Sequence, residues 1–251
     1  MITATLVDNS NSRTKFVFVD DSWELGERLV VNTSEISLAW LKALDKEHGL
    51  GEVYCASVVP DVEAMFREVL GERYHGLKAH TCTQISIDIE QPETLGADRI
   101  ANALAVLEDP SFDYQIVVDL GTAVTFDVIA QGGRYLGGVI APGLGAMDGY
   151  LSKKTALLPT IEFQEPSRAI GKHTKEAMNI GAVVGYRGLI REILSEIQSE
   201  LRGENPNAKI KVVATGGDAA LISRHLDMID EVDPNLTMRG IQYFGQTYGM
   251  N

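Results

Sequence analysis

The chain has 251 residues and a formal net charge of -13, with 45% hydrophobic and 23% charged residues. This length and composition are typical of a globular protein with one large domain or two ordinary ones. The excess of acidic residues disfavours binding to nucleic acid and to anionic membranes. No run of the sequence approaches the roughly 18 apolar residues that would suggest a membrane span.

The start of the chain and its cysteines bear on the cellular compartment. The first residues, MITATLVD, lack the basic segment and the apolar core of a signal peptide. Cys55 and Cys82 form no metal-binding pattern, and we expect them to be reduced thiols packed in a core. The sequence therefore predicts a cytoplasmic location.

Strands and helices alternate along the first half of the chain. Apolar runs, amphipathic spacing and Gly or Pro breaks separate the elements. In order, they are strands at 2–7 and 15–19, a helix at 36–47, a strand at 51–60, a helix at 61–72, a strand at 83–89 and a helix at 97–109. The pattern leaves room for a third strand before the first helix, and Pro110 ends the last helix.

The second half of the chain restarts in the same way. It opens with a strand, an aspartate turn and a returning strand over 114–129. The further elements are a strand at 133–143, helices at 146–158 and 174–201, a strand at 209–217, a helix at 218–226 and a short helix at 235–250. We expect Thr174 to be the N-cap of the long helix.

The openings of the two halves form a weak internal repeat. LVDNSNSRTKFVFV and VVDLGTAVTFDVI each contain two apolar residues, an aspartate, a small-residue turn, and a Thr and a Phe in the returning strand. Because the match falls at the start of both halves, we favour a duplication over two unrelated hairpins. A boundary near Pro110 then gives an N-terminal lobe at 1–109 and a C-terminal lobe at 110–251.

Each opening turn follows an aspartate at a strand end, Asp8 in the first half and Asp119 in the second. Successive backbone N–H groups in such a turn bind anions, and small side chains let phosphate oxygens approach. The aspartate cannot bind phosphate itself, but it can hold a cation that does. The Gly-Gly turn in ATGGDAAL also suits a nucleotide, although alone it indicates only a turn. Together these features suggest a clamp for the phosphates of a nucleotide.

Six segments, in this order, resemble the type III pantothenate kinase family and cover nearly the whole chain. They are LVDNSNSRTKF, ETLGADRIANALA, VVDLGTAVTFDVI, YLGGVIAPGLGAM, AIGKHTKEAMNIGAVVGY and VVATGGDAALI. The resemblance implies an α/β fold of two duplicated ribonuclease-H-like lobes with an ATP cleft between them, as in the actin, sugar-kinase and Hsp70 superfamily.

The resemblance also implies an activity. A member of this family is an ATP-dependent phosphotransferase with an alcohol acceptor, which converts pantothenate to 4'-phosphopantothenate in the first step of coenzyme A biosynthesis. The implied cofactors are ATP, Mg²⁺ and a monovalent cation, K⁺ or NH₄⁺. The implied partners are the small molecule pantothenate and a second copy of the chain, in a homodimer.

The resemblance assigns Asp98, in the segment GADR, as the catalytic base. A carboxylate within hydrogen-bond reach of the substrate hydroxyl can accept its proton and aim it at phosphorus. Without the motif, Asp98 would be interpreted as a helix N-cap, with Arg99 in a surface ion pair. Arg99 is implied to bind the pantothenate carboxylate with two hydrogen bonds. This role explains how an acidic protein can hold an acidic substrate.

Further site residues are implied by position in the matching segments. Those that bind ATP or its phosphates are Asp8, Asn9, Ser10, Asn11, Ser12, Arg13, Thr14, Lys15 and Thr122. The substrate-binding residues are Ile89, Gly96, Ala97, Asp98, Arg99 and Thr174. In the family the matching threonine often comes from the partner subunit. Asp119 is the implied metal residue, for the monovalent cation, whereas Asp8 is linked to Mg²⁺ through water.

Two residues depart from the family pattern. Ser10 stands where the family has a glycine. It is strained by about 1 kcal/mol if the position needs a positive φ, and it narrows the phosphate pocket if the position needs only a small side chain. Either effect weakens ATP binding, so we expect Ser10→Gly to tighten it. Ile89 stands where the family often has a tyrosine, so a hydrogen bond of about 0.5–1.5 kcal/mol to pantothenate is lost.

These departures leave two alternatives open. One is a non-catalytic or regulatory protein on the kinase scaffold, which binds pantothenate or nucleotide without turnover. The other is a kinase for a different small hydroxyl substrate, and the intact GADR segment argues against it.

Overall fold

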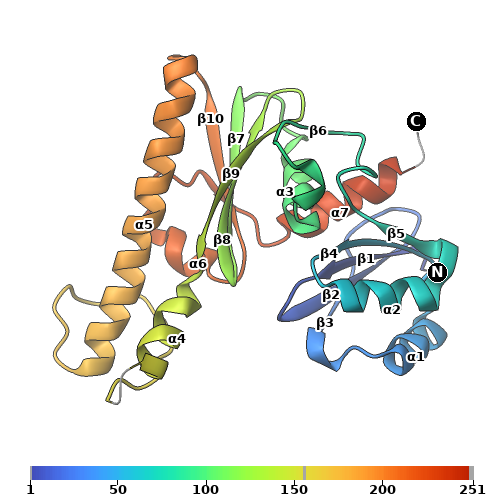
Figure 1. Cartoon of the computed structure of the whole chain (residues 1–251), viewed down its shortest axis with the longest axis horizontal. Coiled ribbons are helices and arrows are strands. Elements are labelled where there is room, and N and C mark those ends of the chain that lie inside the picture. Colours follow the sequence, from blue (N-terminus) through green and yellow to red (C-terminus); the bar gives the residue numbers. More distant parts are fainter. Residues whose placement is uncertain (1, 155–156, 249–251) are drawn as a thin grey trace. The chain divides into compact units, whose positions relative to one another are not determined.

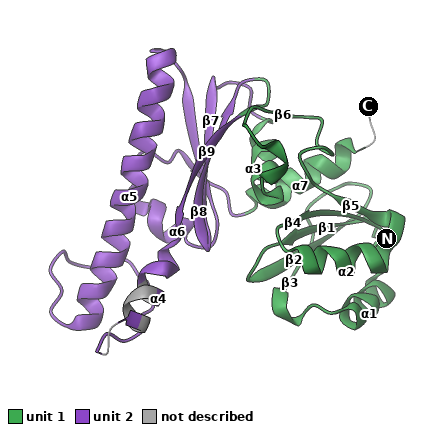
Figure 2. Ribbon diagram, in the orientation of Figure 1, with its two compact units in different colours: residues 1–108, 132–135, 235–251 green, residues 109–131, 136–234 purple. Residues whose placement is uncertain are grey.

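The computed structural model describes residues 2–154 and 157–248, and the chain forms two sheets flanked by helices (Figure 1). It divides into two compact units (Figure 2). Unit 1 comprises Met1–Glu108, Gly132–Tyr135 and Asn235–Asn251, and unit 2 comprises Asp109–Gln131 and Leu136–Pro234. The predicted C-terminal lobe, 110–251, includes the segment from Asn235 onward, which the structure groups with unit 1.

Unit 1 is built on a five-stranded mixed sheet with the order β3-β2-β1-β4-β5. Its strands are β1 (Ala4–Asn9), β2 (Arg13–Val19), β3 (Arg28–Asn32), β4 (Glu52–Ser57) and β5 (Tyr74–Gly76). β2 pairs antiparallel with β1 and β3, whereas β4 pairs parallel with β1 and β5. The central strand β1 is buried along its whole length, so its last residues lie within the protein interior.

Two helices of unit 1 connect strands of this sheet, α1 (Leu38–His48) and α2 (Pro60–Leu70). Ser37 caps α1, because its Oγ accepts a hydrogen bond from the backbone N–H of Trp40. α2 begins with Pro60, whose missing N–H costs nothing at a helix start. The hydrophobic core that joins these helices to the strands contains Phe16 and Phe66.

A pair of helices from distant parts of the sequence completes unit 1, α3 (Ala97–Val106) and α7 (Leu236–Thr247). They pack closely, because a Cβ atom on Gly240 of α7 would lie 1.7 Å from the carbonyl oxygen of Ala101 in α3. The hydroxyl of Thr237 also donates a hydrogen bond to Oδ1 of Asn102 at 2.8 Å. α7 therefore supports the helix whose first turn carries Asp98.

The sheet of unit 2 repeats the strand order of unit 1. Five of its six strands are β7 (Tyr114–Leu120), β8 (Ala123–Ala130), β9 (Arg134–Pro142), β10 (Ile210–Thr215) and β11 (Glu231–Val232). Read as β9-β8-β7-β10-β11, they follow the order β3-β2-β1-β4-β5, and the parallel pairings of β10 match those of β4. This correspondence confirms the predicted duplication, with β7 in the place of β1.

The helices of unit 2 are α4 (Leu144–Lys154), α5 (Thr174–Glu204) and α6 (Ala219–Ile222). The long helix α5 runs beside the sheet, and α4 lies near its first turns (Figure 1). Arg187 of α5 is buried, and its guanidinium donates hydrogen bonds to both carboxylate oxygens of Glu165 at 2.9 and 2.6 Å. This ion pair anchors the loop before α5.

Several elements differ from the sequence prediction. The strand predicted at 83–89 is only β6 (Ser86–Ile87), which pairs with Arg134 and Tyr135 at the start of β9. The helix predicted at 146–158 begins two residues earlier and ends at Lys154, and positions 155 and 156 of that prediction lie outside the described residues. Position 249 onward of the last predicted helix also lies outside them.

The cap of α5 corrects a further prediction. His173 is the N-cap, and its Nδ1 accepts a hydrogen bond from the backbone N–H of Glu176 at 3.3 Å. Thr174 is instead the first residue of the helix. Within the described part of the chain, no helix combines the length and the apolar character needed to cross a membrane.

Candidate active site

The turn between β1 and β2 holds Asp8 with two neighbouring side chains. Nζ of Lys15 lies 2.7 Å from Oδ2 of Asp8, and Oγ of Ser10 donates a hydrogen bond to Oδ1 at 2.8 Å. Asp8 and Lys15 are cross-strand partners in the antiparallel pair, which places both side chains on one face of the hairpin. The ammonium group provides the counter-charge that a buried carboxylate requires.

Position 10 does not require a glycine. Among the described residues, Trp23 is the only non-glycine residue with a positive φ, so Ser10 has an ordinary backbone conformation. The strain considered for Ser10 on the basis of a positive φ is therefore absent. Its hydroxyl turns back to Asp8 rather than standing free in the turn.

The polar residues of the turn divide into those that build it and those that are exposed. Nδ2 of Asn9 donates to Oγ1 of Thr14 at 2.7 Å, and Oγ of Ser57 donates to Oδ1 of Asn9 at 2.6 Å. These contacts are buried and tie the turn to β4. The exposed side chains at the tip are Asn11, Ser12 and Arg13.

Asp98 lies in the first turn of α3, where Gly96 is the N-cap. It is therefore not the helix cap that the sequence alone would suggest. Its Oδ1 accepts a hydrogen bond from the backbone N–H of Arg99 at 2.8 Å. A Cβ atom on Gly96 would lie 2.5 Å from that oxygen, so only a glycine leaves the carboxylate this position.

The carboxyl group of Asp98 has a raised pKa. Burial is the main cause, and the negative charge of Asp8 adds to it, while the hydrogen bond from the backbone of Arg99 opposes it. The structure therefore brings the predicted base and the aspartate of the first phosphate turn close enough for their charges to interact. A carboxyl group with a raised pKa in such a place is a good candidate for proton transfer.

The guanidinium group of Arg99 lies over an aromatic ring, a contact that the sequence did not predict. Its guanidinium carbon lies 5.9 Å from the centroid of the ring of Tyr135, a buried residue of β9 that belongs to unit 1. Such a ring attracts the guanidinium and restricts its orientation. Ala97 is buried in α3, and Ile89 is half-buried in the segment after β6.

In unit 2, three segments meet at the turn between β7 and β8. A Cβ atom on Gly143 would lie 2.3 Å from the carbonyl oxygen of Gly121 and 2.5 Å from that of Thr122. The backbone N–H of Gly143 donates to the carbonyl oxygen of Thr122 at 3.1 Å. On the other side, a Cβ atom on Gly216 would lie 2.6 Å from Oδ1 of Asp119. Glycines after β9 and β10 thus let the backbone approach the second aspartate turn closely.

Asp218 is a carboxylate at this end of unit 2 that sequence reasoning did not single out. Its backbone N–H donates to the carbonyl oxygen of Leu120 at 3.1 Å, so it lies beside the end of β7. Burial raises the pKa of its carboxyl group. Burial, followed by the negative charges of Asp218 and Asp119, raises the pKa of the Tyr186 hydroxyl.

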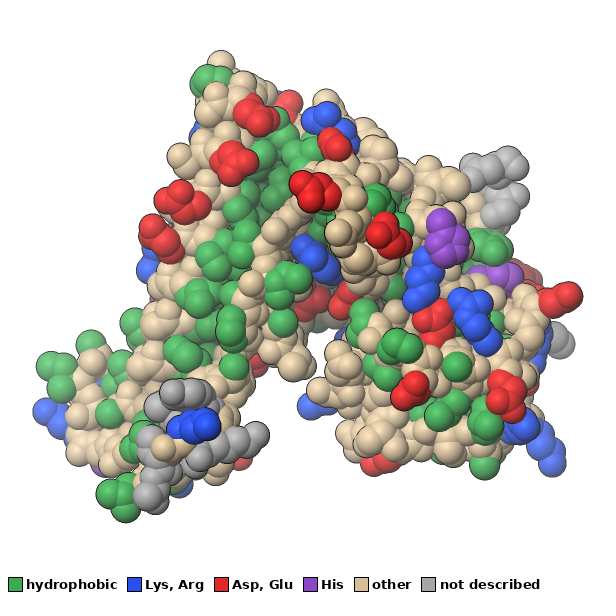
Figure 3. Space-filling model, in the orientation of Figure 1, with side chains coloured by type: hydrophobic (Ala, Val, Ile, Leu, Met, Phe, Trp, Pro, Cys, Tyr) green, Lys and Arg blue, Asp and Glu red, His purple; other side chains and the backbone are tan. Residues whose placement is uncertain are grey.

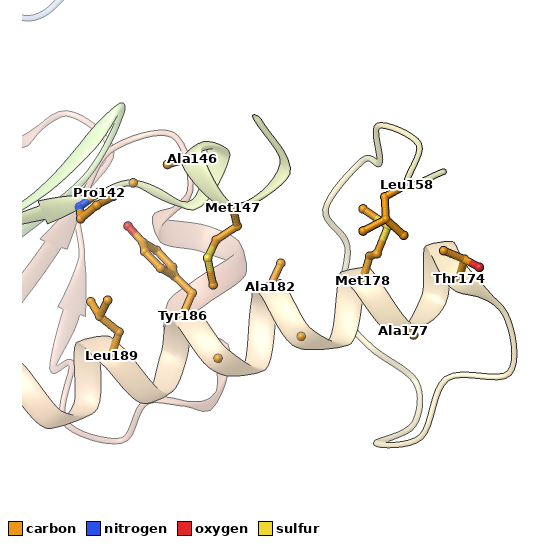
Figure 4. Close-up of a pocket in the computed structure, with 13 residues that line it drawn as sticks. Pro142, Ala146, Met147, Leu158, Thr174, Ala177, Met178, Ala182, Tyr186 and Leu189 are labelled. Carbon is orange, nitrogen blue, oxygen red and sulfur yellow. The ribbon is translucent and has the colours of Figure 1, made fainter. Parts of the chain in front are cut away.

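A cavity of about 960 Å³ opens between the start of α4 and the first half of α5 (Figure 4). Its lining is mainly apolar, and Met147 of α4 and Tyr186 of α5 both reach into it (Figure 4). Thr174 lies at the far end of the cavity, beyond Leu158 and Met178 (Figure 4). Its hydroxyl is the polar group that the predicted substrate contact would use.

The described residues contain no group of three or more His, Cys, Asp or Glu side chains that could hold a metal ion by themselves. The predicted site residues fall into two sets, one in each unit. Asp8, Lys15 and Asp98 belong to unit 1, and Asp119 and Thr122 belong to unit 2. Sequence reasoning missed Tyr135, Gly143 and Gly216 as individual residues, although each lies in a segment that it quoted.

Solved structures with the same fold include several kinases. A protein named as a Baf family transcriptional activator from Campylobacter jejuni superposes with a TM-score of 0.65 at 21% identity, covering 96% of this chain and 97% of the other. A ROK family glucokinase from Streptomyces griseus gives 0.53 at 12% identity, with 99% of each chain covered. These likenesses, with the duplicated sheets, define a mixed α/β protein with the fold that these kinases share.

Sequence comparison identifies the family within this class. The model described as type III pantothenate kinase matches residues 5–196. A type III pantothenate kinase of Akkermansia muciniphila is 46% identical over 241 residues, which cover 96% of this chain and 97% of the relative. One of Methylacidiphilum infernorum is 38% identical over 243 residues, which cover 96% and 87%. The chain belongs to the type III pantothenate kinase family.

Proposed function

We propose that the chain transfers the γ-phosphoryl group of ATP to the hydroxyl group of pantothenate, with Asp98 as the base. The observation that carries this proposal is the setting of Asp98: Gly96 leaves room for its carboxyl group at the start of α3, and burial together with the charge of Asp8 raises the pKa of that group. In its ionised form it would accept the proton of the substrate hydroxyl. Arg99, the next residue, would bind the carboxylate of pantothenate.

Each of the two aspartate turns offers donors that suit the phosphates of ATP. The exposed tip at Asn11 and Ser12 and the ammonium group of Lys15 offer donors in unit 1. The hydroxyl and backbone of Thr122 offer them in unit 2, where Gly143 keeps the turn compact. Because phosphoryl transfer depends mainly on positioning and charge stabilisation, such donors are what the reaction requires.

The donor set fits the Mg²⁺ ion that accompanies ATP. Asp8 supplies hard carboxylate oxygens, and the described residues lack a larger acidic cage, so phosphate oxygens and water would complete the coordination. A bound Mg²⁺ ion neutralises charge on the phosphate oxygens. The carboxylate of Asp119 would hold the monovalent cation, K⁺ or NH₄⁺, and the carbonyl oxygen of Leu120 is a second oxygen near Gly216, whose Cβ position lies 2.6 Å from Asp119 Oδ1 and 2.5 Å from that carbonyl.

One of the two observations that favoured the non-catalytic alternative is weakened by the structure. It depended on Ser10 and Ile89, and the backbone of Ser10 is unstrained. A coupled assay with pantothenate, ATP, Mg²⁺ and K⁺ tests the proposed function. We expect turnover that Asp98→Asn removes, whereas binding of pantothenate or nucleotide without product would favour the non-catalytic protein. A screen of other small alcohols tests the remaining alternative.

Cysteine chemistry supports a cytoplasmic location for the proposed enzyme. Both cysteines are free thiols in buried positions. Burial raises the pKa of Cys55 to about 12, so this thiol stays protonated and unreactive at neutral pH. Unpaired, inert thiols are typical of a reducing compartment.

We also propose that the protein forms a homodimer through the apolar side of unit 2. Figure 3 shows hydrophobic side chains gathered along this unit. The large apolar side chains of unit 2 that are exposed include Met147, Leu157, Ile170 and Val184. Apolar side chains that gather on one face of a protein often mark an interface. The cavity that Thr174 lines lies in the same unit, so a partner at this surface could complete it.

The mass of the protein in solution tests the homodimer. We expect light scattering to give twice the chain mass of 27.3 kDa. Val184 is 51% exposed on α5, and Val184→Asp should shift the mass toward the monomer because a charge would have to be buried. Ser199→Asp, which adds the same charge at another exposed position of α5, is the matched control. A wild-type monomer at high concentration would refute the proposed assembly.

A further inference from the structure

The carboxylate of Asp8 is held on both oxygens by side chains of its own hairpin. Oγ of Ser10 donates to Oδ1 at 2.8 Å, and Nζ of Lys15 contacts Oδ2 at 2.7 Å. Asp8 is only 3% exposed, so these two side chains are its close polar partners within the hairpin. With both contacts the carboxylate has one orientation. Without the hydroxyl, only the ammonium group of a long, flexible side chain holds it.

The backbone of Ser10 is also fixed, which determines where its hydroxyl points. Its N–H donates to the carbonyl oxygen of Arg13 at 3.1 Å, and its carbonyl oxygen accepts a hydrogen bond from Oγ1 of Thr33 at 2.6 Å. Thr33 is itself buried, and its hydroxyl also contacts Oγ1 of Thr14. The turn is therefore tied to the segment after β3, and the short side chain of Ser10 is aimed at Asp8.

We propose that Ser10 is a positioning residue, which orients the carboxylate of Asp8 for binding Mg²⁺-ATP and does not itself bind phosphate. This inference rests on the proposed function, because it assigns Asp8 to the metal and phosphate end of the site. It reverses the sign expected from the sequence for Ser10→Gly. Removing the side chain relieves no strain and deletes a hydrogen bond to a charged group, so binding should weaken.

Three substitutions at Ser10 separate the hydroxyl from the size of the side chain. Ser10→Gly and Ser10→Ala should each weaken Mg²⁺-ATP binding and raise its KM about tenfold, since a hydrogen bond to a charged group shifts an equilibrium by roughly that factor or more. The kcat should change less, because the lost contact is made before and during reaction alike. Ser10→Thr keeps the hydroxyl and should retain most of the affinity.

A serine elsewhere in unit 1 provides a matched control. Oγ of Ser22 donates to Oδ1 of Asp20 at 2.7 Å with the same two-residue spacing, but this contact is exposed. Ser22→Ala should leave Mg²⁺-ATP binding unchanged. Thermal unfolding of every variant shows whether it is folded. If Ser10→Ala is not folded, Ser10→Thr and Ser10→Gly still decide the question, since the proposal requires them to differ.

A double-mutant cycle tests whether Ser10 acts through Asp8. In the Asp8→Asn background, Ser10→Ala should have little further effect on Mg²⁺-ATP affinity measured by calorimetry. Equal losses in both backgrounds, or tighter binding by Ser10→Gly, would overturn the proposal. Calorimetry of Mg²⁺-ATP binding in the absence of pantothenate also tests the role of Ser10 separately from the proposed kinase activity. If the wild type binds Mg²⁺-ATP but does not phosphorylate pantothenate, the proposed function fails while the Ser10 comparison can still be made.

Discussion

The negative charge of Asp8 acts on the carboxyl group of Asp98 and helps to raise its pKa. The two residues come from the end of β1 and the start of α3, so the fold places like charges near each other. Lys15 neutralises part of the charge on Asp8 through its 2.7 Å contact. The ionised state of Asp98, which the proposed reaction needs, is therefore sensitive to both neighbours.

The first prediction concerns the substitution Asp98→Asn. Turnover should fall by roughly 10²- to 10⁴-fold, the usual contribution of a general base. Thermal stability at neutral pH should rise, because the amide removes a charge whose burial is unfavourable. A coupled assay and scanning calorimetry measure the two effects. Unchanged turnover would exclude Asp98 as the base, and reduced stability would contradict the burial argument.

The second prediction is the direction of a pH effect. The folded pKa of Asp98 lies above the ordinary value of 3.8, so proton uptake stabilises the fold and this stabilisation is lost as pH rises through the folded pKa. Activity changes in the opposite direction. As the pH is lowered, kcat/KM for pantothenate should decrease because the base becomes protonated, and the decrease should set in at a pH above the ordinary pKa of 3.8. Replacing Asp8 with Asn should lower the pKa of Asp98.

A carbon NMR titration of the Asp98 carboxyl group measures that shift without any need for activity. Burial is the larger cause and remains in Asp8→Asn, so only part of the elevation should disappear. Asp20→Asn, an exposed substitution away from the site, provides the control. An unchanged or higher pKa of Asp98 in Asp8→Asn would show that the two charges do not interact.

The third prediction concerns substrate recognition by Arg99. Arg99→Gln should raise the KM for pantothenate by about 10- to 100-fold, the effect of losing a charge-assisted contact. An analogue of pantothenate in which a hydroxyl group replaces the carboxylate should be phosphorylated equally well by the wild type and the variant. Arg202→Gln, at the end of α5, is the control. Equal losses for both substrates would mean that Arg99 serves the structure rather than the carboxylate.

The fourth prediction compares two glycines that lie two residues apart. Gly143→Ala would place a methyl group 2.3 Å from the carbonyl oxygen of Gly121, so it should displace the second phosphate turn and raise the KM for ATP. A Cβ atom on Gly145 would meet nothing within 4 Å. Gly145→Ala lies in α4 and should stabilise the protein slightly, by up to about 1 kcal/mol. Steady-state kinetics and thermal unfolding of both variants decide the comparison, and equal behaviour would contradict it.

The elements that local pattern determines were predictable from the sequence. The apolar run before Asp8 is β1, and the amphipathic segment after Gly96 is α3. The repeat between the two hairpins corresponds to the same strand order in both sheets. These features depend on periodicity and on residues close together in the chain, which the sequence displays directly.

What could not be predicted depends on distant contacts. The hydroxyl of Ser10 points to Asp8 in a turn that Thr33 fixes from outside the hairpin. The ring near Arg99 comes from Tyr135, in the other half of the sequence. The alternation in ISIDI suggested a long strand, but the strand that forms is β6, in which Ser86 and Ile87 pair with Arg134 and Tyr135 of β9. The local sequence pattern of a strand does not determine which distant segment will pair with it.

The position of α7 has a consequence for biosynthesis. This helix packs on α3, yet it follows the whole of unit 2 in the chain. β1 and α3 are therefore synthesised long before the helix that packs on them. The first lobe to be translated must be the last to be completed, and its nascent form exposes the apolar face of α3 until α7 emerges. A chain that stops just before Asn235 would therefore lack the helix that packs on α3 of unit 1, although it would contain all of unit 2.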